Sequence, residues 1–576
     1  MNKAKYILFL LLAISSFQIF PCTSYLVGKG ATTDGSTLIS YAGDSHVRYG
    51  QLYFKPAGKW AEGTMMTLYD RSSNKPLGQI PQARETYKVI GFMNEHQVSI
   101  GESTYGGRSE LTDTLGKIDW GSIMFLGLQR AKTAREAIKV IVELLDAHGY
   151  YSSGQSYSIA DPNEVWILEL IGKGMDIKID RKTKQAYNTR KGAVWVARRV
   201  PDNCISAHAN HARITNFPME NGTTSISSNN LDKIFEPNIE TVYAHDVISF
   251  AREMKYFKGS DEEFSFSDAY APLDFGAARF CELRVWAMFN RAAGGMDKYW
   301  DYATGKTKGP RMPLWVKPNR KLTPQDLMTF KGDYLQGTEL DMSKDIGAGP
   351  QGMPYRWRPM TWKYKNKDYF HERVTATQQT AFSWVSQMRN FMPNPIGGIF
   401  WYGLDDANLT VHAPFYCGMT HVPYAYDEKN GDILTYSETS AFWIFNRVSH
   451  TIYLFYSRLI DDVRKKQNSL SEKFVNYVKA SDAAAMAIYK ENPEFAIQYL
   501  TEFSHNNANA MLAEWKEFGN FLLVKYLDGN VKQEEGGVFL RNEYDFPLSP
   551  KNPELPDEYK QNIIEKTGDR FLVPKN

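Results

Sequence analysis

Short strand-like runs of apolar residues dominate the chain up to about residue 430. Residues 23–43 hold two of them, Tyr25–Val27 and Thr37–Tyr41, on either side of an Asp34-Gly35 step. An Asp-Gly step between two apolar runs is typical of a β-hairpin. Residues 89–101 predict a second strand pair, with its tight turn at 94–96. Residues 23–43 and 89–101 are therefore each expected to form an antiparallel strand pair.

Strand-like runs continue further along the chain, interrupted by one strong helical pattern. Thr133 and Glu136 form a capping-box pattern, apolar residues then recur at helical spacing up to Leu145, and Gly149 follows as a stop. Residues 157–170 predict a further hairpin, and residues 193–197 predict a strand. The remaining strand-like runs include residues 397–403 and 411–416.

Long helical patterns replace the strands from Ala441 onward. They cover residues 441–466, about 470–490 and about 493–527, with a capping-box pattern at Ser469–Glu472 and Gly529 as the final stop. Before them, residues 274–291 turn helical from about Phe280. Strands and helices are thus grouped, without β-α-β alternation.

This grouping predicts an α+β fold in which antiparallel sheets stack on each other and helices lie outside. We expect four segments along the chain. They are a signal peptide or propeptide (1–21), the main sheet domain (22–435), a helical C-terminal region (436–535) and an extended tail (536–576).

The first 21 residues have the features of a secretory leader. Lys3 and Lys5 precede an apolar stretch, 6–20, that is too short to span a membrane comfortably. We expect an exported protein, periplasmic or extracellular, and no stable membrane span. Pro21 is unfavourable for signal peptidase, so either cleavage occurs upstream with autocatalytic trimming, or Cys22 carries a lipid. Residues 19–21 make a poor lipobox, which disfavours the lipid anchor.

Composition and missing motifs exclude several classes of function. The formal net charge of +2 gives no field for nucleic acid or an anionic membrane. The chain has four cysteines, so if Cys22 is set apart at most one disulfide forms, and the other cysteines are expected as small buried hydrophobic residues. Walker-type phosphate-binding loops and a nucleophile-elbow serine are both missing from the sequence.

Cys22 offers unusual chemistry if the leader ends at Pro21. An N-terminal cysteine carries a thiol and a free amine on one Cα, and the amine can act as base for the thiol. The predicted hairpin returns Asp44 toward Cys22, where a carboxylate would hold the amine, although a strand-end aspartate is equally typical of a turn cap.

Further candidate residues lie downstream. Glu102 and Ser103 end a predicted strand and face either a cleft or solvent. His208 and His211 invite a zinc interpretation, which we disfavour because no carboxylate or cysteine stands at the right spacing. Asn210 between them is a good oxyanion donor. Arg279 lies near a helix start, where the dipole disfavours a cation, so it suggests an anionic partner.

Several short motifs, taken together, resemble the C69 (U34) dipeptidase family of N-terminal-nucleophile hydrolases over most of residues 22–470. The motifs are Cys22–Ser24, Thr33–Ser36, Asn94–Ser103, Trp195–Asp202, Ala209–Ile214 and Ser440–Trp443. The family is also similar to the choloylglycine hydrolase and penicillin V acylase group.

The resemblance implies a four-layer αββα sandwich, cleavage of dipeptides and no cofactor or metal. It implies that Cys22 is the nucleophile, Asp44 holds its amine, Asn210 is an oxyanion donor and Arg279 is the cation beside the thiolate. Tyr41 stands where the acylases have an arginine.

The acylases' second asparagine falls near Glu102 or Ser103, whose identities differ. Glu102 is a candidate for meeting the ammonium of a dipeptide, and we expect substrate contacts from Asn94, Glu102 and Ser103. Short peptides are the expected partners. Two alternatives stay open: an amidase acting on N-acyl amino acids or conjugated bile salts, and a non-catalytic surface lipoprotein that binds peptides.

Overall fold

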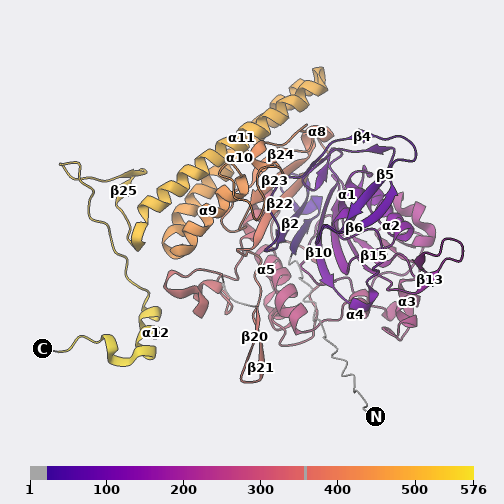
Figure 1. Ribbon diagram of the computed structural model, residues 1–576, viewed down its shortest axis with the longest axis horizontal. Coiled ribbons are helices and arrows are strands. Elements are labelled where there is room, and N and C mark those ends of the chain that lie inside the picture. The colour runs from indigo at the N-terminus through magenta and orange to yellow at the C-terminus, as the bar shows by residue number, and fades with distance from the viewer. Residues whose placement is uncertain (1–21, 356–359, 576) are drawn as a thin grey trace, which may run out of the picture.

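Two stacked β-sheets lie between two layers of helices in the computed structural model, which describes residues 22–355 and 360–575. Figure 1 shows the layers in order: the long C-terminal helices, the sheet with β2 and β22–β24, the sheet with β10 and β15, and then α1 and α2. Strand β10 packs on β1 and β2, so the inner faces of the sheets meet there. The expected four-layer α+β sandwich is confirmed.

The first sheet has seven strands, and every neighbouring pair in it is antiparallel. Its order is β19 (Trp315–Val316), β16 (Ile205–His208), β1 (Cys22–Val27), β2 (Thr37–Asp44), β22 (Thr380–Met388), β23 (Ile399–Leu404) and β24 (Ala413–Tyr416). Strand β1, which begins with Cys22, is an interior strand.

The second sheet has nine strands and is antiparallel except for its β17–β18 edge. Its order is β17 (Ser225–Ser227), β18 (Thr241–Tyr243), β15 (Ala193–Arg199), β12 (Val165–Gly172), β11 (Gly154–Ala160), β10 (Ser99–Gly106), β9 (Met93–Asn94), β8 (Val89–Ile90) and β3 (Phe54–Lys55). Five small pairs complete the strands: β4 (Gly58–Lys59) with β7 (Glu85–Thr86), β5 (Met65–Tyr69) with β6 (Pro76–Pro81), β13 (Ile177–Ile179) with β14 (Ala186–Asn188), β20 (Thr361–Tyr364) with β21 (Lys367–Phe370), and β25 (Glu534–Glu535) with β26 (Val538–Phe539).

Helices cover the outer face of each sheet. The α-helices are α1 (Ser122–Leu128), α2 (Ala134–His148), α3 (Val247–Glu253), α4 (Phe266–Tyr270), α5 (Leu283–Ala292), α6 (Trp300–Ala303), α7 (Pro324–Lys331), α8 (Asn394–Gly397), α9 (Ala441–Leu454), α10 (Tyr456–Glu491), α11 (Pro493–Lys525) and α12 (Asp557–Thr567). Helices α1 and α2 pack on the nine-stranded sheet, whereas α5, α7, α9 and α11 pack on the seven-stranded one. With both faces covered, every residue of β1 and β2 is buried.

The predicted hairpin at the start of the folded chain is confirmed. Strands β1 and β2 pair with Cys22 opposite Gly43, and Gly35 between them has a φ of 82°, a left-handed value that a glycine tolerates without strain. Asp44 directly follows the residue opposite Cys22. Sequence spacing therefore sets the end of β2 beside the sulfur-bearing residue.

Helix α2 also follows its sequence pattern. The Thr133 hydroxyl accepts the Glu136 backbone N–H at 3.1 Å, and Gly149, with a φ of 77°, ends the helix. The buried residues of α2 include Ile138, Ile141 and Leu145, which form its apolar stripe.

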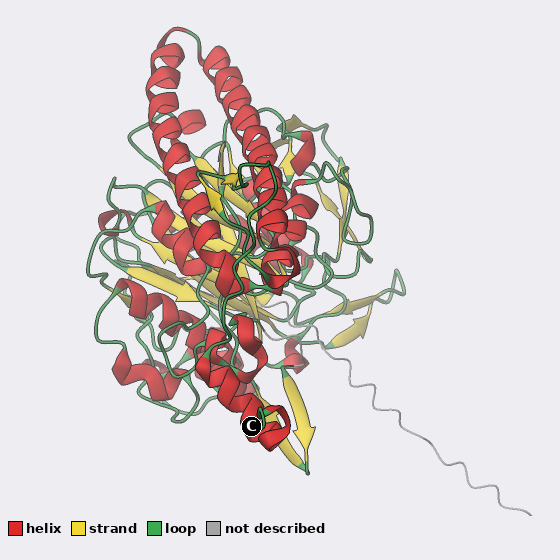
Figure 2. Cartoon of the chain, turned by 90° about the vertical axis from the view of Figure 1, so that its left-hand side faces the viewer, coloured by secondary structure: helices red, strands yellow, loops and turns green. Residues whose placement is uncertain are grey.

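The C-terminal helices differ from the prediction at two points. The break falls at Phe455, and α10 then continues through Ser469–Glu472, so these residues lie inside a helix and are not its cap. Leu459, Val463 and Leu470 keep one buried face in register along α10, which packs on α11. Tertiary packing thus overrides a local capping pattern. Figure 2 shows the two long helices side by side. The last long helix ends at Lys525, before Gly529.

The predicted leader lies outside the described residues. Among the residues that are described, no helix combines the length and apolarity needed to cross a bilayer.

Candidate active site

Cys22 begins β1 and lies in a buried polar cluster between the two sheets. Its side chain and backbone are 1% exposed. Its sulfur lies 3.2 Å from the Tyr41 hydroxyl and 3.4 Å from Glu102 Oε1, and its backbone nitrogen donates to Asn210 Oδ1 at 2.9 Å. Both reactive atoms of the residue therefore have polar partners.

Tyr41 and Glu102 form the side of the cluster that contacts sulfur. The Tyr41 hydroxyl donates to Glu102 Oε1 at 2.7 Å, which links β2 of one sheet to β10 of the other. Burial raises the pKa of the Cys22 thiol well above its usual value, and the Glu102 charge adds to this effect. The Tyr41 hydrogen bond and the nearby Arg48 act in the opposite direction. The thiol therefore needs a base to be deprotonated near neutral pH.

Glu102 has one satisfied and one unsatisfied carboxylate oxygen. Oε1 accepts from Tyr41, but the buried Oε2 has no hydrogen-bond partner. Burial raises the pKa of this carboxyl, whereas the Tyr41 hydrogen bond and Arg48 lower it. Such an oxygen is costly to bury unless a donor reaches it.

Asn210 holds the nitrogen side of the cluster. Its Oδ1 accepts from the Cys22 nitrogen and from Arg284 Nη2 at 2.8 Å, and its Nδ2 donates to the Thr104 carbonyl at 2.6 Å. Its φ of 65° is a left-handed value that asparagine adopts more readily than most residues. The oxyanion role predicted for Asn210 stays a prediction, because in this structure its amide bridges the two sheets.

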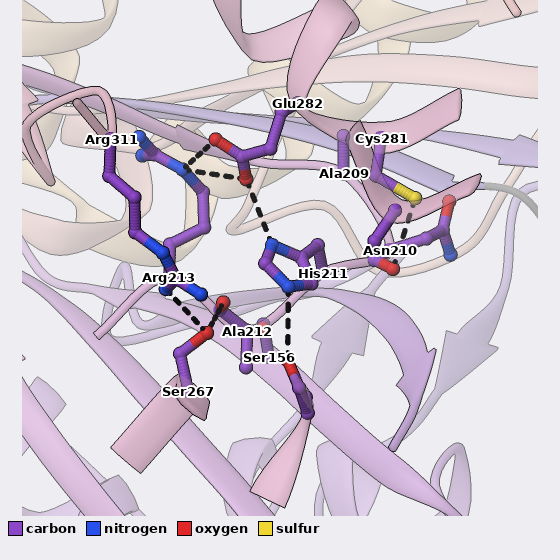
Figure 3. Close-up of polar contacts among 12 residues, drawn as sticks. Ser156, Ala209, Asn210, His211, Ala212, Arg213, Ser267, Cys281, Glu282 and Arg311 are labelled. Atoms are coloured by element: carbon purple, nitrogen blue, oxygen red, sulfur yellow. Dashed lines mark hydrogen bonds and ion pairs between the residues drawn. The ribbon is translucent and has the colours of Figure 1, made fainter. Parts of the chain in front are cut away.

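Buried charges on both sides fix the loop that carries Asn210. Glu169 accepts the backbone N–H groups of Arg213 and Ile214 at 2.6 and 2.9 Å. Figure 3 shows Glu282 in contact with His211 and Arg213, and the Cys281 thiol donating to the Asn210 carbonyl at 3.2 Å. Burial alone would raise the pKa of Glu282, but Arg213 and His211 outweigh burial and lower it to about 2.

The arginine that reaches Cys22 is Arg284 on α5. Its Nη1 donates to the Cys22 carbonyl at 2.7 Å and to Thr23 Oγ1 at 2.8 Å, and its Nη2 donates to the Ala209 carbonyl at 3.0 Å. Burial lowers the pKa of Arg284 to about 10, which still leaves it charged at neutral pH.

Arg279 makes different contacts. Its Nε donates to the Thr304 carbonyl at 3.0 Å, and its guanidinium lies 5.2 Å from the centre of the Phe275 ring. These contacts do not support a position of Arg279 beside the thiolate. The role of Arg279 stays a prediction. Among the arginines of this segment, the structure brings Arg284 to Cys22.

Asp44 lies in the cluster but faces a different partner from the one expected. Its Oδ2 pairs with Arg373 Nη2 at 2.5 Å, and its Oδ1 accepts from Thr380 Oγ1 at 2.6 Å. Burial raises the pKa of Asp44, and Arg373 partly offsets this rise. In the full-length chain, the Cys22 nitrogen binds Asn210 instead, so the amine-holding role of Asp44 stays a prediction.

Asn94 and Ser103 use their side chains elsewhere. Asn94 Oδ1 accepts the backbone N–H groups of His96 and Val98, and its Nδ2 binds the carbonyls of Leu128 and Ala131. This side chain therefore shapes the turn before β10. Substrate contact by Asn94 stays a prediction.

Ser103 lies one residue beyond Glu102 on β10. Its Oγ bonds Nδ1 of His208 at 2.6 Å, and the other ring nitrogen bonds Ser158 at 2.7 Å. His211 is likewise bonded on both nitrogens, to Glu282 and to the Ala271 carbonyl. The two histidines thus bind protein groups with all four ring nitrogens. Ser103 as a substrate contact stays a prediction.

The other three cysteines are free. Cys281 and Cys417 are buried, which raises the pKa of their thiols to about 11 and about 12. Cys204 is half-buried. The expectation of buried small hydrophobic residues is confirmed for two of the three.

A pocket of about 600 Å³ borders the cluster. Arg373, the partner of Asp44, lines it together with Phe280, His46 and Glu372. The Phe280 ring lies 5.6 Å from the Arg373 guanidinium and 5.9 Å from that of Arg284. The pocket and the Cys22 cluster thus share a wall.

Sequence reasoning missed three buried cations near Cys22. They are Arg284, Arg373 and Lys331, which are 0, 4 and 0% exposed. Lys331 Nζ donates to the Thr23 carbonyl and lies 4.2 Å from the centre of the Tyr25 ring. A single charge inside an apolar run, as in Leu283-Arg284-Val285-Trp286, was the available signal for Arg284.

Comparison with known proteins places these residues in a family. The family model described as Peptidase family C69 matches residues 21–469, from the residue before Cys22 to the middle of α10. The chain belongs to peptidase family C69. The match includes Cys22, Tyr41, Glu102, Asn210 and Arg284.

Relatives of this C69 protein are distant but cover most of its length. It is 22% identical to a probable dipeptidase of Latilactobacillus sakei, over 85% of this chain and 92% of the relative. It is 20% identical to dipeptidase A of Lactobacillus helveticus, over 88% and 98%. It is 23% identical to a dipeptidase of Bifidobacterium longum, over 74% and 76%.

Proposed function

We propose that this C69 protein is an exported dipeptidase that uses Cys22 as an N-terminal nucleophile. The observation that carries the proposal is the cluster in which the sulfur and the nitrogen of one strand-initial cysteine both meet polar groups. Membership of a peptidase family and relatives named dipeptidase support peptides as the substrates.

The proposed reaction begins when removal of residues 1–21 converts the Cys22 amide into a free amine. The amine takes the thiol proton, and the resulting thiolate attacks the scissile carbonyl carbon. Arg284 and Asn210 orient the residue through its carbonyl and its nitrogen, and Asn210 is the proposed oxyanion donor. One such donor is typically worth about 3–4 kcal/mol.

The second half of the reaction releases the products. The ammonium of Cys22 returns its proton to the leaving amine as the C–N bond breaks, which leaves a thioester. Water then attacks the thioester, with the Cys22 amine as base, and regenerates the thiol. The groups named supply every proton transfer, so the scheme requires no cofactor.

Replacement of the sulfur tests the proposal. Cys22→Ala should lose dipeptide hydrolysis by at least about 1000-fold while the protein stays folded, because the substitution removes the attacking sulfur. Cys204→Ala is the matched control, since this half-buried thiol lies outside the cluster. Intact mass should show that the active wild type begins with an unmodified Cys22. Parental turnover by Cys22→Ala would refute the mechanism, and an added diacylglycerol would favour a lipoprotein.

A further inference from the structure

The unpaired oxygen of Glu102 lies next to the attacking atom. Oε1 of the same carboxylate is 3.4 Å from Cys22 Sγ and accepts from Tyr41, while Oε2 is buried without a partner. Glu102 is 1% exposed. A buried carboxylate oxygen without a donor gains free energy when a cation or a hydrogen-bond donor binds to it.

We propose that Glu102 Oε2 binds the α-ammonium of the substrate residue whose carbonyl carbon Cys22 attacks. The site then requires a peptide with a free N-terminus and cleaves after its first residue. This inference rests on the proposed function, because it takes Cys22 Sγ as the attacking atom.

The distances fit this assignment. In a productive complex, the sulfur lies about 3–3.5 Å from the carbonyl carbon. The α-nitrogen of the same residue lies about 2.5 Å from that carbon, because two covalent bonds of about 1.5 Å separate them. The ammonium therefore comes within about 6 Å of Sγ. The Glu102 carboxylate, with Oε1 at 3.4 Å, lies inside this radius.

Glu102 lies near two neutral phenols and one cation. The cross-strand neighbour of Glu102 on β11 is Tyr157, and the hydrogen-bond partner of Glu102 is Tyr41. Both side chains are neutral phenols. Arg48, half-buried nearby, is the cation that lowers the pKa of Glu102. An ammonium that reaches Oε2 would make a charge-assisted bond in a site shielded from water.

An N-acyl amino acid cannot make this contact, because the acyl group that Cys22 would attack carries no α-ammonium. A site built to bind a polar substrate group rejects an analogue without that group by up to about 10⁴–10⁵-fold, because the protein group is then left unpaired. The carboxylate therefore accounts for a choice of dipeptides over N-acyl amino acids.

The test compares two substrates that differ only in the ammonium. They are L-Ala-L-Ala, or the dipeptide cleaved fastest in a panel, and its desamino analogue, which for L-Ala-L-Ala is propionyl-L-Ala. We expect wild type to favour the dipeptide by at least about 100-fold in kcat/KM. Glu102→Gln should reduce this preference below about 10-fold, mostly by lowering kcat/KM for the dipeptide.

Glu95→Gln is the matched control. It makes the same change in the hairpin that leads into β10, where Glu95 accepts the Lys88 backbone N–H at 2.8 Å. This variant should keep the wild-type preference. If Glu102→Gln lowers kcat/KM for both substrates equally, Glu102 acts on the thiol through Oε1 and the inference is refuted, while the proposed function stands.

A measurement on wild type alone covers the case in which Glu102→Gln does not fold. L-Alaninamide should inhibit dipeptide cleavage with a Ki at least about 10-fold below that of propionamide, which lacks only the amine. Equal inhibition would refute ammonium binding. If wild type cleaves no dipeptide of the panel, the proposed function itself fails.

Discussion

Removal of the Arg284 guanidinium should destabilise the fold and disable the site together. All five N–H groups of this side chain donate within the protein: to the carbonyls of Phe280, Cys22 and Ala209, to Thr23 Oγ1 and to Asn210 Oδ1. The side chain is fully buried. Arg284→Met removes every one of these donors and keeps an unbranched side chain as far as the position of Nε.

The magnitude follows from the acceptors left behind. A hydrogen bond from a charged group is worth about 1.5–3 kcal/mol, and the carbonyl oxygens of Cys22 and Ala209 each lose one. Methionine, however, has no charge to desolvate, which offsets part of the loss. Two such bonds give about 3–6 kcal/mol, and with this offset we expect Arg284→Met to lower the free energy of unfolding by about 3–5 kcal/mol.

Arg279→Met is the control in the same segment. Arg279 is half-buried, with one hydrogen bond to Thr304 and an aromatic contact with Phe275, so its loss should cost about 1 kcal/mol or less. The assay is urea unfolding of both variants beside wild type, with dipeptide kcat/KM measured below the unfolding transition. An Arg279→Met variant as unstable as Arg284→Met, or more impaired in turnover, would refute the assignment of Arg284.

Two further predictions concern the thiol and the loop that carries Asn210. Tyr41→Phe removes a hydrogen bond that lowers the pKa of Cys22, so the pH profile of thiol alkylation should move to higher pH and kcat/KM should fall about 10-fold; an unchanged profile would contradict this role. Glu282, whose pKa is lowered to about 2, contributes about 3 kcal/mol of stability that is fully present above about pH 4.5 and is lost as the pH falls toward 2. Urea unfolding at several pH values should therefore show Glu282→Gln less stable than wild type at pH 6, with the gap closing between pH 4.5 and 2; a constant gap would contradict the linkage.

The neighbourhood of Cys22 could be predicted where local signals decide it. The Asp34-Gly35 turn sets the β1–β2 register, and this register alone brings Asp44 next to the residue opposite Cys22. The contact between Cys22 and Asn210 spans 188 positions, and no local pattern encodes it. Only the family resemblance placed Asn210 with the nucleophile.

The choice between Arg279 and Arg284 illustrates why the rest could not be predicted. Residues Ala277–Glu282 form a π-helical turn, which shifts the rotational phase of the helix that follows. Five residues along a helix also place two side chains on different faces. A pattern based on 3.6 residues per turn cannot tell which of the two faces meets β1, because the answer depends on how α5 packs against the sheet.

An interior position for β1 has a consequence for activation. The strand is bonded to β16 on one side and β2 on the other, and Asn210 Oδ1 already accepts from the Cys22 nitrogen while the peptide bond before it is intact. Under the proposed maturation, the precursor is a zymogen whose fold around Cys22 is already complete. Its latency would then depend on the acyl group attached to one nitrogen, and hydrolysis of that single bond would switch on turnover without any refolding.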